Sequence, residues 1–270
     1  MRPEQLLTEF HEQVRLQDRD SPPGRVVDRD GPVHRSYEAD PAVRGAMIES
    51  PSGLGPDPDL WIARQVAFFG ERRQDVEWKA YSTDEPADLG QRLVAAGFVA
   101  EEVESLVLGS AADLVHEVHL PSGVRIREIS SDEDWDRTLA MMGAVWGEGA
   151  EWVSHRLRAE QREAPELLRA VVVEQGDPGD PTAPPTGPVL SFSMLRPTPG
   201  TRFCGLWGGT TDAAWRGRGL YRASVAWRAR LALDLGYPSV RVDCSADSLP
   251  ILVRLGLHAV ATTTPYVLRF

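Results

Sequence analysis

The chain has 270 residues, 42% of them hydrophobic, and a formal net charge of −11. This length and composition are typical of a protein with a sizeable core, arranged as two ordinary domains or one large one. The acidic balance argues against nucleic acid as a partner, because neutralising phosphate groups requires a basic surface. We also expect no membrane association, because no apolar run approaches the ~20 residues that a membrane-spanning helix needs.

The N-terminal residues and the cysteines indicate the cellular compartment. The opening sequence MRPEQLLTEFHEQ is charged and amphipathic and lacks the apolar core of a secretion signal. The two cysteines, Cys204 and Cys244, are expected to be buried small residues in a reducing environment. We therefore expect a cytoplasmic protein. The six histidines form no metal-spaced pair, so we predict no metal site.

The N-terminal third predicts alternating helices and strands. It begins with a helical pattern over residues 3–17. A hairpin follows at residues 25–37, because Asp30-Gly31 is a typical tight turn between two β-prone runs. The remaining elements are a strand at 45–49, a Gly/Pro-rich loop at 51–58, a helix at 60–72, a strand at 76–81, a helix at 88–96 and a strand at 105–108.

The rest of the chain follows a linker at residues 109–123, in which one short strand is expected at 115–120. Ser131 followed by three acidic residues predicts a helix N-terminus. The expected elements are strands at 124–129, 168–174, 189–195, 203–211, 239–244 and 266–270, helices at 135–145, 151–163 and 248–255, and an exposed loop at 175–187. Residues 213–235 are expected to contain a Gly-rich turn and then a helix that ends at Gly236.

The two halves share one order of elements. When "RLVAAGFVAEEVESLVL" is laid beside "ILVRLGLHAVATTTPYVL", Gly97 matches Gly256 and Leu108 falls near Leu268. This match predicts a mixed α/β fold built from two copies of one supersecondary plan. A chance match between common α/β elements is the alternative.

The segment "WRGRGLYRAS", residues 215–224, places three arginines and two glycines just before a helical run. A helix N-terminus offers backbone N–H groups to an anion, and arginine adds hydrogen bonds to phosphate oxygens. This turn is therefore expected to bind a phosphorylated cofactor, although a Gly-rich turn also serves as a simple tight connection. It lacks the lysine of a nucleotide-hydrolase phosphate loop and the third glycine of a dinucleotide-binding fingerprint.

The segment Arg216-Gly217-Arg218-Gly219-Leu220-Tyr221 resembles the [QR]-x-x-G-x-[GA] signature of the GNAT superfamily (Gcn5-related N-acetyltransferases), with Tyr221 in place of the last small residue. Residues 245–257, "SADSLPILVRLGL", resemble a second conserved block of that family. The resemblance implies a mixed-sheet α/β fold with two GNAT-like acyl-CoA N-acyltransferase domains in tandem. We expect a degenerate domain at 1–112 and a complete acetyltransferase domain at 123–270.

The resemblance also implies an acetyl-CoA site. In this family the strand before the turn contacts the pantetheine and the thioester, and the turn holds the pyrophosphate. A bulge at Trp207-Gly208-Gly209 would splay a pair of neighbouring strands and admit the cofactor, unless those glycines only kink the strand. The residues assigned to the cofactor are Gly209, Thr210, Thr211, Arg216, Gly217, Arg218, Gly219, Leu220, Tyr221 and Ser245.

The residues for proton transfer depart from the family pattern. The tyrosine usually found four residues before the helix-ending glycine is replaced by Leu252. Tyr266 is a candidate acid and Asp243 a candidate base, while a core role for Tyr266 and a water chain in place of Asp243 are the alternatives. Trp146, Glu148 and Trp207 are expected to line the acceptor pocket, although both tryptophans also suit a core.

These assignments predict an N-acetyltransferase that moves acetyl from acetyl-CoA to a primary amine of a small molecule or peptide by direct transfer. The alternative is a catalytically impaired acyl-CoA-binding regulatory or interaction protein, which the absence of the usual tyrosine favours. The expected partner is the amine acceptor, and we expect that the chain can form a homodimer.

Overall fold

The structure is a computed structural model, and it describes residues 1–17, 24–43, 45–147, 150–180 and 183–270. The chain forms two compact units. Residues 2–107, 243–250 and 259–270 form what we call the N-terminal unit, and residues 108–242 and 251–258, with Met1, form the C-terminal unit. The division into domains at 1–112 and 123–270 stays a prediction.

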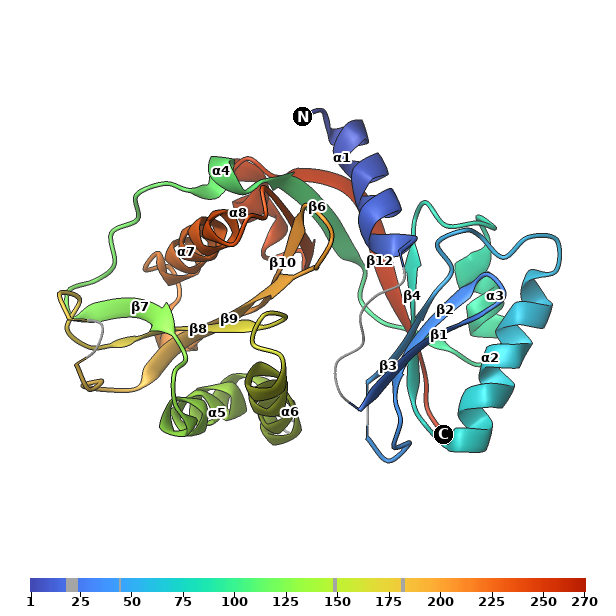
Figure 1. Ribbon diagram of the computed structural model, residues 1–270, viewed down its shortest axis with the longest axis horizontal. Helices are drawn as coiled ribbons and strands as arrows, with labels where there is room; N and C mark the ends of the chain where they lie inside the picture. The colour runs from blue at the N-terminus through green and yellow to red at the C-terminus, as the bar shows by residue number, and fades with distance from the viewer. Residues whose placement is uncertain (18–23, 44, 148–149, 181–182) are drawn as a thin grey trace. The chain divides into compact units, whose positions relative to one another are not determined.

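The N-terminal unit has a mixed sheet in the order β1-β2-β3-β4-β12 (Figure 1). Only the β3–β4 pair of this path is parallel, and the short strand β5 pairs with β12. The strands are β1 (Arg25–Asp30), β2 (Val33–Glu38), β3 (Ala46–Glu49), β4 (Val76–Tyr81), β5 (Val99–Ala100) and β12 (His258–Leu268).

Alternation along β4 places helices on both faces of this sheet. Trp78 is fully buried and belongs to a hydrophobic core with residues of α2 (Pro58–Arg72) and α3 (Leu89–Ala95). On the opposite face, the Tyr81 ring lies 6.2 Å from that of Phe10, at the end of α1 (Pro3–Phe10). A π-helical turn, η1 (His11–Arg15), continues α1, and its buried Arg15 forms a 2.6 Å ion pair with Asp84.

In the C-terminal unit the sheet runs in the order β11-β10-β9-β8-β7. Its β10–β11 pair is parallel and the others are antiparallel. Figure 1 shows α5 and α6 on one face of this sheet and α7 on the other. The elements are β6 (Glu104–Ser110), which leads into the unit, α4 (Ala111–Leu114), β7 (Val124–Glu128), α5 (Asp132–Trp146), α6 (Ala150–Glu163), β8 (Arg169–Gln175), β9 (Val189–Pro197), β10 (Phe203–Thr211), η2 (Ala213–Trp215), α7 (Leu220–Asp234), β11 (Ser239–Cys244) and α8 (Leu249–Arg254).

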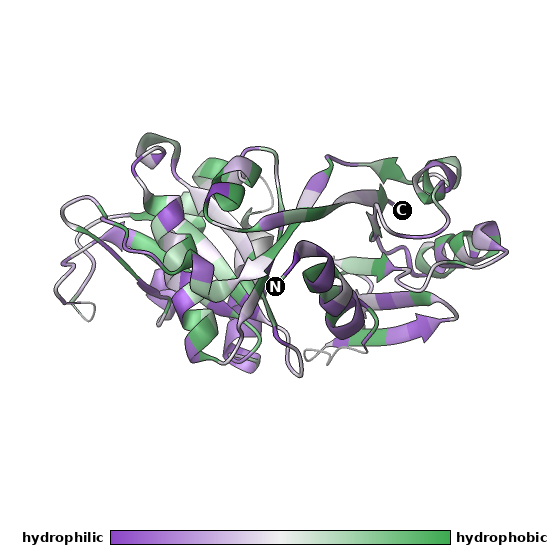
Figure 2. Cartoon of the chain, turned by 90° about the horizontal axis from the view of Figure 1, so that it is seen from above, coloured by the Kyte–Doolittle hydropathy of each residue, from purple (hydrophilic) through white to green (hydrophobic). Residues whose placement is uncertain are grey.

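Most of the predicted elements are confirmed, and the hydropathy pattern explains why. Figure 2 shows hydrophobic and hydrophilic residues alternating around the helices, as expected of helices that cover one face of a sheet. Asp30 pairs with Val33 across the expected hairpin turn, in which Gly31 has a φ of +59°. The Ser131 side chain caps α5 by accepting from the Asp134 amide at 3.2 Å, as its acidic first turn predicts.

Two predicted strands differ from the structure, one in its existence and one in its extent. Residues 115–120 are not a strand, because they follow the short helix α4, which Ser110 caps, and have no pairing partner among the described strands. The closing strand begins at His258 rather than at residue 266. Thr263 in it pairs with Tyr81, a partner so distant in the chain that local pattern does not indicate the pairing.

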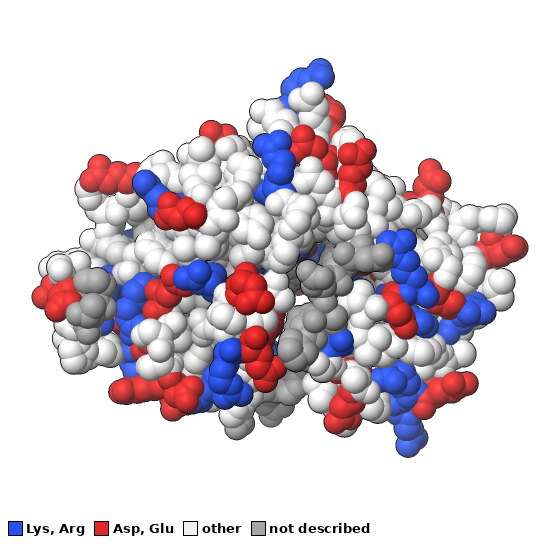
Figure 3. Space-filling model, viewed as in Figure 1, with Lys and Arg blue, Asp and Glu red and all other residues white. Residues whose placement is uncertain are grey.

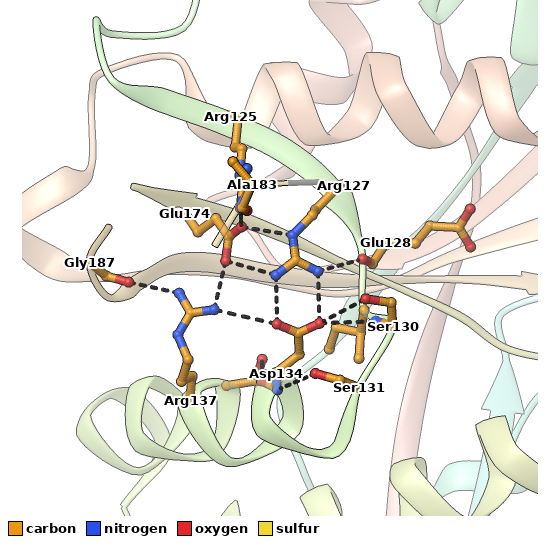
Figure 4. A network of polar contacts seen from close by, with 12 residues as sticks. Arg125, Arg127, Glu128, Ser130, Ser131, Asp134, Arg137, Glu174, Ala183 and Gly187 are labelled. Atoms are coloured by element: carbon orange, nitrogen blue, oxygen red, sulfur yellow. Dashed lines mark hydrogen bonds and ion pairs between the residues drawn. The ribbon is translucent and has the colours of Figure 1, made fainter. Parts of the chain in front are cut away.

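Buried ion pairs connect the first turn of α5 with strands β7 and β8 of the sheet (Figure 4). Glu174 of β8 is fully buried and accepts from Arg125 and Arg127 of β7 at 2.9 and 2.7 Å and from Arg137 of α5 at 2.8 Å. Arg127 also binds Asp134 at 2.7 Å. Burial by itself raises the pKa of Glu174, but the hydrogen bonds from the arginines outweigh it and hold that pKa below its ordinary value. This network sets the position of α5 on the sheet.

Candidate functional site

The Gly/Arg turn lies between β10 and α7, as the sequence predicts. Gly217 has a φ of +74° and Gly219, the N-cap of α7, a φ of +85°. An L-residue with a side chain rarely adopts this backbone conformation, so the path of the turn requires glycine at both positions. The turn therefore leads the chain directly from the short helix η2 into α7.

The backbone amides at the start of α7 have no hydrogen-bond acceptors among the described residues. Among the residues that the structure describes, the backbone N–H groups of Gly217, Arg218, Gly219 and Leu220 donate to no acceptor. No side chain caps this helix and its first turn has no acidic residue, in contrast to the first turn of α5, which has three. Uncapped amides at the positive end of a helix attract an anion.

Three arginines surround these amides, and all three side chains are exposed. Arg216 Nε donates to the Thr211 carbonyl at 3.2 Å, and the Arg218 guanidinium lies 4.7 Å from the centre of the Trp215 ring. The Arg222 guanidinium lies beside Gly219. On the face drawn in Figure 3, basic and acidic side chains of the described residues are interspersed. Residues 215–224, by comparison, include three arginines and no acidic residue.

The end of β10 contains the expected bulge. Trp207 pairs with Met194 and Thr210 with Phe192, so Gly208 and Gly209 stand opposite a single residue of β9. Gly208 has a φ of +63°. The paired register between β10 and β11 covers Phe203–Gly205 and ends before the bulge, although β10 continues to Thr211. The two strands therefore separate where the sequence places the cofactor.

Two tryptophans expected in an acceptor pocket gather at this bulge. Trp146, the last residue of α5, donates from Nε1 to Thr210 Oγ1 at 3.0 Å, and its exposed fraction is 36%. Trp207 is half-buried, packs against the core under α5 and α6, and has the Arg241 guanidinium 5.6 Å from its ring centre. The third residue expected there, Glu148, lies outside the described residues.

A residue that the sequence analysis missed, Arg228, is fully buried beneath the bulge. Its guanidinium donates to the carbonyl oxygens of Met194 and Trp207 at 2.9 and 3.2 Å, one on each strand. Burial lowers the pKa of Arg228 to about 10, and no carboxylate in the described residues pairs with it. Its position among the apolar residues of "VAWRARL" was the available signal, because an arginine flanked by core positions must be partnered internally.

The remaining candidate residues lie in the N-terminal unit. Asp243 Oδ2 accepts from Lys79 Nζ at 2.8 Å, and its side chain is 4% exposed. Tyr266 lies on β12 opposite Trp78, with its hydroxyl against Gly90 of α3. Ser245 is exposed, and its carbonyl accepts from the amides of Ser248 and Leu249.

The cysteines and the metal-binding residue types show no reactive arrangement among the described residues. Both cysteines are free and buried, and burial raises the pKa of Cys204 to about 12 and that of Cys244 to about 11. Neither thiol is therefore suited to act as a nucleophile at neutral pH. The described His, Cys, Asp and Glu side chains form no group of three or more that could hold a metal ion. Nor does any described helix have the length and apolar character needed to cross a membrane.

Comparisons with known proteins relate this geometry to solved folds. No protein-family model matches the sequence, and neither does any curated protein. A GCN5-related N-acetyltransferase from Kribbella flavida is 17% identical with a TM-score of 0.68, over 98% of this chain and 94% of that one. A GCN5-related N-acetyltransferase from Sphaerobacter thermophilus is 13% identical with a TM-score of 0.62, over 88% and 76%. A tandem GNAT protein from the clavulanic acid biosynthesis pathway is 11% identical with a TM-score of 0.59, over 98% and 95%.

Proposed function

Because the chain has the fold of the GCN5-related N-acetyltransferases, we propose that it is an N-acetyltransferase that moves acetyl from acetyl-CoA to a primary amine of a small molecule or peptide. The transfer is direct, since both thiols are buried and unsuited to carry an acyl group. The proposed setting is the cytoplasm, where these thiols stay reduced.

The observation that supports acetyl-CoA binding most strongly is the uncapped start of α7 beside the separated ends of β10 and β11. In the proposal, the amides of residues 217–220 and the three neighbouring arginines hold the pyrophosphate. The pantetheine then follows the bulged end of β10, at Gly209, Thr210 and Thr211, where the register with β11 has ended. Ser245 stays a prediction of the family resemblance.

We propose that the acceptor amine binds at the two tryptophans of the bulge. Trp146 and Trp207 present aromatic surface at the same segment of β10 that is proposed to hold the thioester. The chemistry requires a neutral amine, stabilisation of the developing oxyanion and a proton for the departing thiolate. The candidates named from the sequence for proton transfer, Asp243 and Tyr266, stay predictions.

Calorimetry with coenzyme A and a thiol-release assay over a panel of amines test the proposal together. The informative variant is Arg216→Ala combined with Arg218→Ala, which is expected to weaken coenzyme A binding at least tenfold because charged hydrogen bonds to the pyrophosphate are lost. Arg230→Ala is the matched control, because Arg230 is an exposed arginine of the same helix, away from the turn. Wild-type protein that binds no coenzyme A would refute the proposal.

A second candidate function is acyl-CoA binding without turnover, in a regulatory or interaction protein. One observation favours it. Leu252, at the position of the tyrosine that usually acts as the general acid, is fully buried and is part of the core. This function predicts coenzyme A binding by calorimetry and no thiol release with any amine, whereas the acetyltransferase predicts both.

A further inference from the structure

Acetyl transfer leaves a thiolate that must be protonated. Neither Leu252 nor Tyr266 is suited to donate that proton. Leu252 has no ionisable group and is fully buried. Tyr266 packs against the hydrophobic core of the N-terminal unit, with its hydroxyl against Gly90. The proposed acetyl-CoA site therefore needs another proton donor.

Tyr221 lies at the bulge of β10. A Cβ atom built on Gly209 would stand 2.7 Å from Tyr221 Cε2, 3.4 Å from its Cδ2 and 3.9 Å from its Cζ, so the Cδ2–Cε2 edge of the ring rests on this glycine. Any side chain at residue 209 would displace the ring. Tyr221 is half-buried and belongs to the first turn of α7, next to the uncapped amides. It thus connects the proposed pyrophosphate site with the strand segment proposed to hold the thioester.

Arg228 supplies a buried positive charge on the same helix as Tyr221. It lies on α7, two turns beyond Tyr221, and is 1% exposed. Its hydrogen bonds go to neutral carbonyl oxygens, on Ser224, Met194 and Trp207, and no described carboxylate compensates its charge. Residues seven apart lie on the same face of a helix, so Arg228 and Tyr221 share one face of α7. Burial lowers the pKa of Arg228, and a negative charge on Tyr221 would raise it. A cation and a phenolate on the same helix face stabilise each other.

We propose that Tyr221 is the catalytic acid that protonates the departing thiolate, and that Arg228 is a positioning residue that stabilises the resulting phenolate. This inference rests on the proposed acetyltransferase function. It gives one reason for tyrosine at the position where the signature has a small residue, and for glycine at the residue beneath its ring.

The step balances as follows. The amine nitrogen forms a bond with the thioester carbonyl carbon, and the C–S bond breaks with its electron pair leaving on sulfur. The Tyr221 hydroxyl gives its proton to that sulfur. The proton released by the amine returns to the phenolate through water. The products are an N-acetyl amide and a free thiol, with Tyr221 restored.

Tyr221→Phe is the first test, read by kcat and by calorimetry with coenzyme A. The expected result is a loss of about 10²-fold or more in kcat, the scale of general acid catalysis, with coenzyme A affinity within a factor of about two of wild type. Tyr237→Phe is the control, because Tyr237 is another half-buried tyrosine, located beyond the far end of α7, and its loss should leave kcat unchanged.

The pH profile separates an acid from a residue that only packs. Activity should fall at alkaline pH as the phenol ionises, and this limb should disappear in Tyr221→Phe. Replacing Tyr221 by 3-fluorotyrosine, which keeps the shape but has a more acidic phenol, should move the limb to lower pH. Arg228→Met should move the alkaline limb to higher pH, and the limb of Arg228→Lys should lie between those of Arg228→Met and of wild type. Should the Arg228 variants fail to fold, the fluorotyrosine shift decides alone.

The outcomes distinguish this inference from the function on which it rests. If wild-type protein releases no thiol with any amine, the acetyltransferase proposal fails and the inference fails with it. If wild-type protein is active and Tyr221→Phe retains its rate and its alkaline limb, only the role of Tyr221 is overturned. Loss of coenzyme A affinity without a change in the pH profile also overturns it, because Tyr221 would then only bind.

Discussion

The indole Nε1 of Trp146 donates a 3.0 Å hydrogen bond to Thr210 Oγ1. The bond joins the last residue of α5 to the first paired residue after the β10 bulge. Thr210 is 9% exposed, whereas Trp146 is 36% exposed. One end of α5 is thus attached to the bulge, while its first turn is attached to the sheet by the ion pairs around Glu174.

A double-mutant cycle with Trp146→Phe and Thr210→Val measures this contact. Each single change should cost about 1 kcal/mol of unfolding free energy, because it leaves the other polar group without its partner. The double variant should cost less than the sum of the single changes, by about 0.5 kcal/mol or more. Urea denaturation gives these values. Strict additivity would show that the bond contributes nothing to stability.

Gly208→Ala should destabilise the protein and weaken coenzyme A binding. Gly208 has a φ of +63°, a conformation that costs an alanine about 1–2 kcal/mol. A Cβ there would also approach Met194 Cε to 2.7 Å. Gly143→Ala is the control, because Gly143 lies inside α5 with open space around it and should gain about 0.5–1 kcal/mol. Thermal unfolding and calorimetry test both, and equal effects would contradict the assignment of strain to the bulge.

Glu174→Gln should be among the most destabilising single changes in the C-terminal unit. The fully buried carboxylate accepts from Arg125, Arg127 and Arg137. Removing its charge leaves buried guanidinium groups uncompensated, at a cost of about 3–5 kcal/mol. Asp132→Asn is the control, since Asp132 pairs with Arg158 on the surface, where water screens the attraction and the pair contributes little to stability. Similar midpoints of urea unfolding for the two variants would contradict the prediction.

Stability should fall at acid pH through the same network. The pKa of Glu174 is held below its ordinary value despite burial, and that of Asp134 is also lowered despite burial, by hydrogen bonds from Arg127 and from Ser130. A carboxylate with a lowered pKa stabilises the folded state above the ordinary pKa, and that stabilisation is lost as pH falls through the folded value. Unfolding free energies measured from pH 7 down to pH 3 should therefore decrease, and less steeply in Glu174→Gln.

Local patterns in the sequence were sufficient for most elements of the fold and for the turn. The Asp30-Gly31 hairpin, the Ser131 cap and the glycines of residues 216–219 depend on contacts within a few residues, so their chemistry is visible in the chain itself. The bulge was also expected, because adjacent glycines in a strand interrupt its register.

Long-range partners were not predictable in this way. Nothing near Asp243 in the chain indicates that Lys79 neutralises it, and nothing near Tyr266 indicates that its hydroxyl lies against Gly90. The extension of β12 to His258 likewise depends on pairing with β4. These features arise when segments distant in the chain pack together, which local propensity does not encode.

By itself the sequence determined where most of the helices and strands occur and that a Gly/Arg turn precedes α7, while it missed α4 and β5 and predicted a strand at 115–120 that is absent. Only the tertiary structure showed that the amides of that turn lack acceptors among the described residues, that Tyr221 rests on Gly209, and that no described carboxylate pairs with the buried Arg228. The physical reason is that backbone conformation follows from neighbouring residues, whereas burial and charge compensation depend on what the fold places around each side chain.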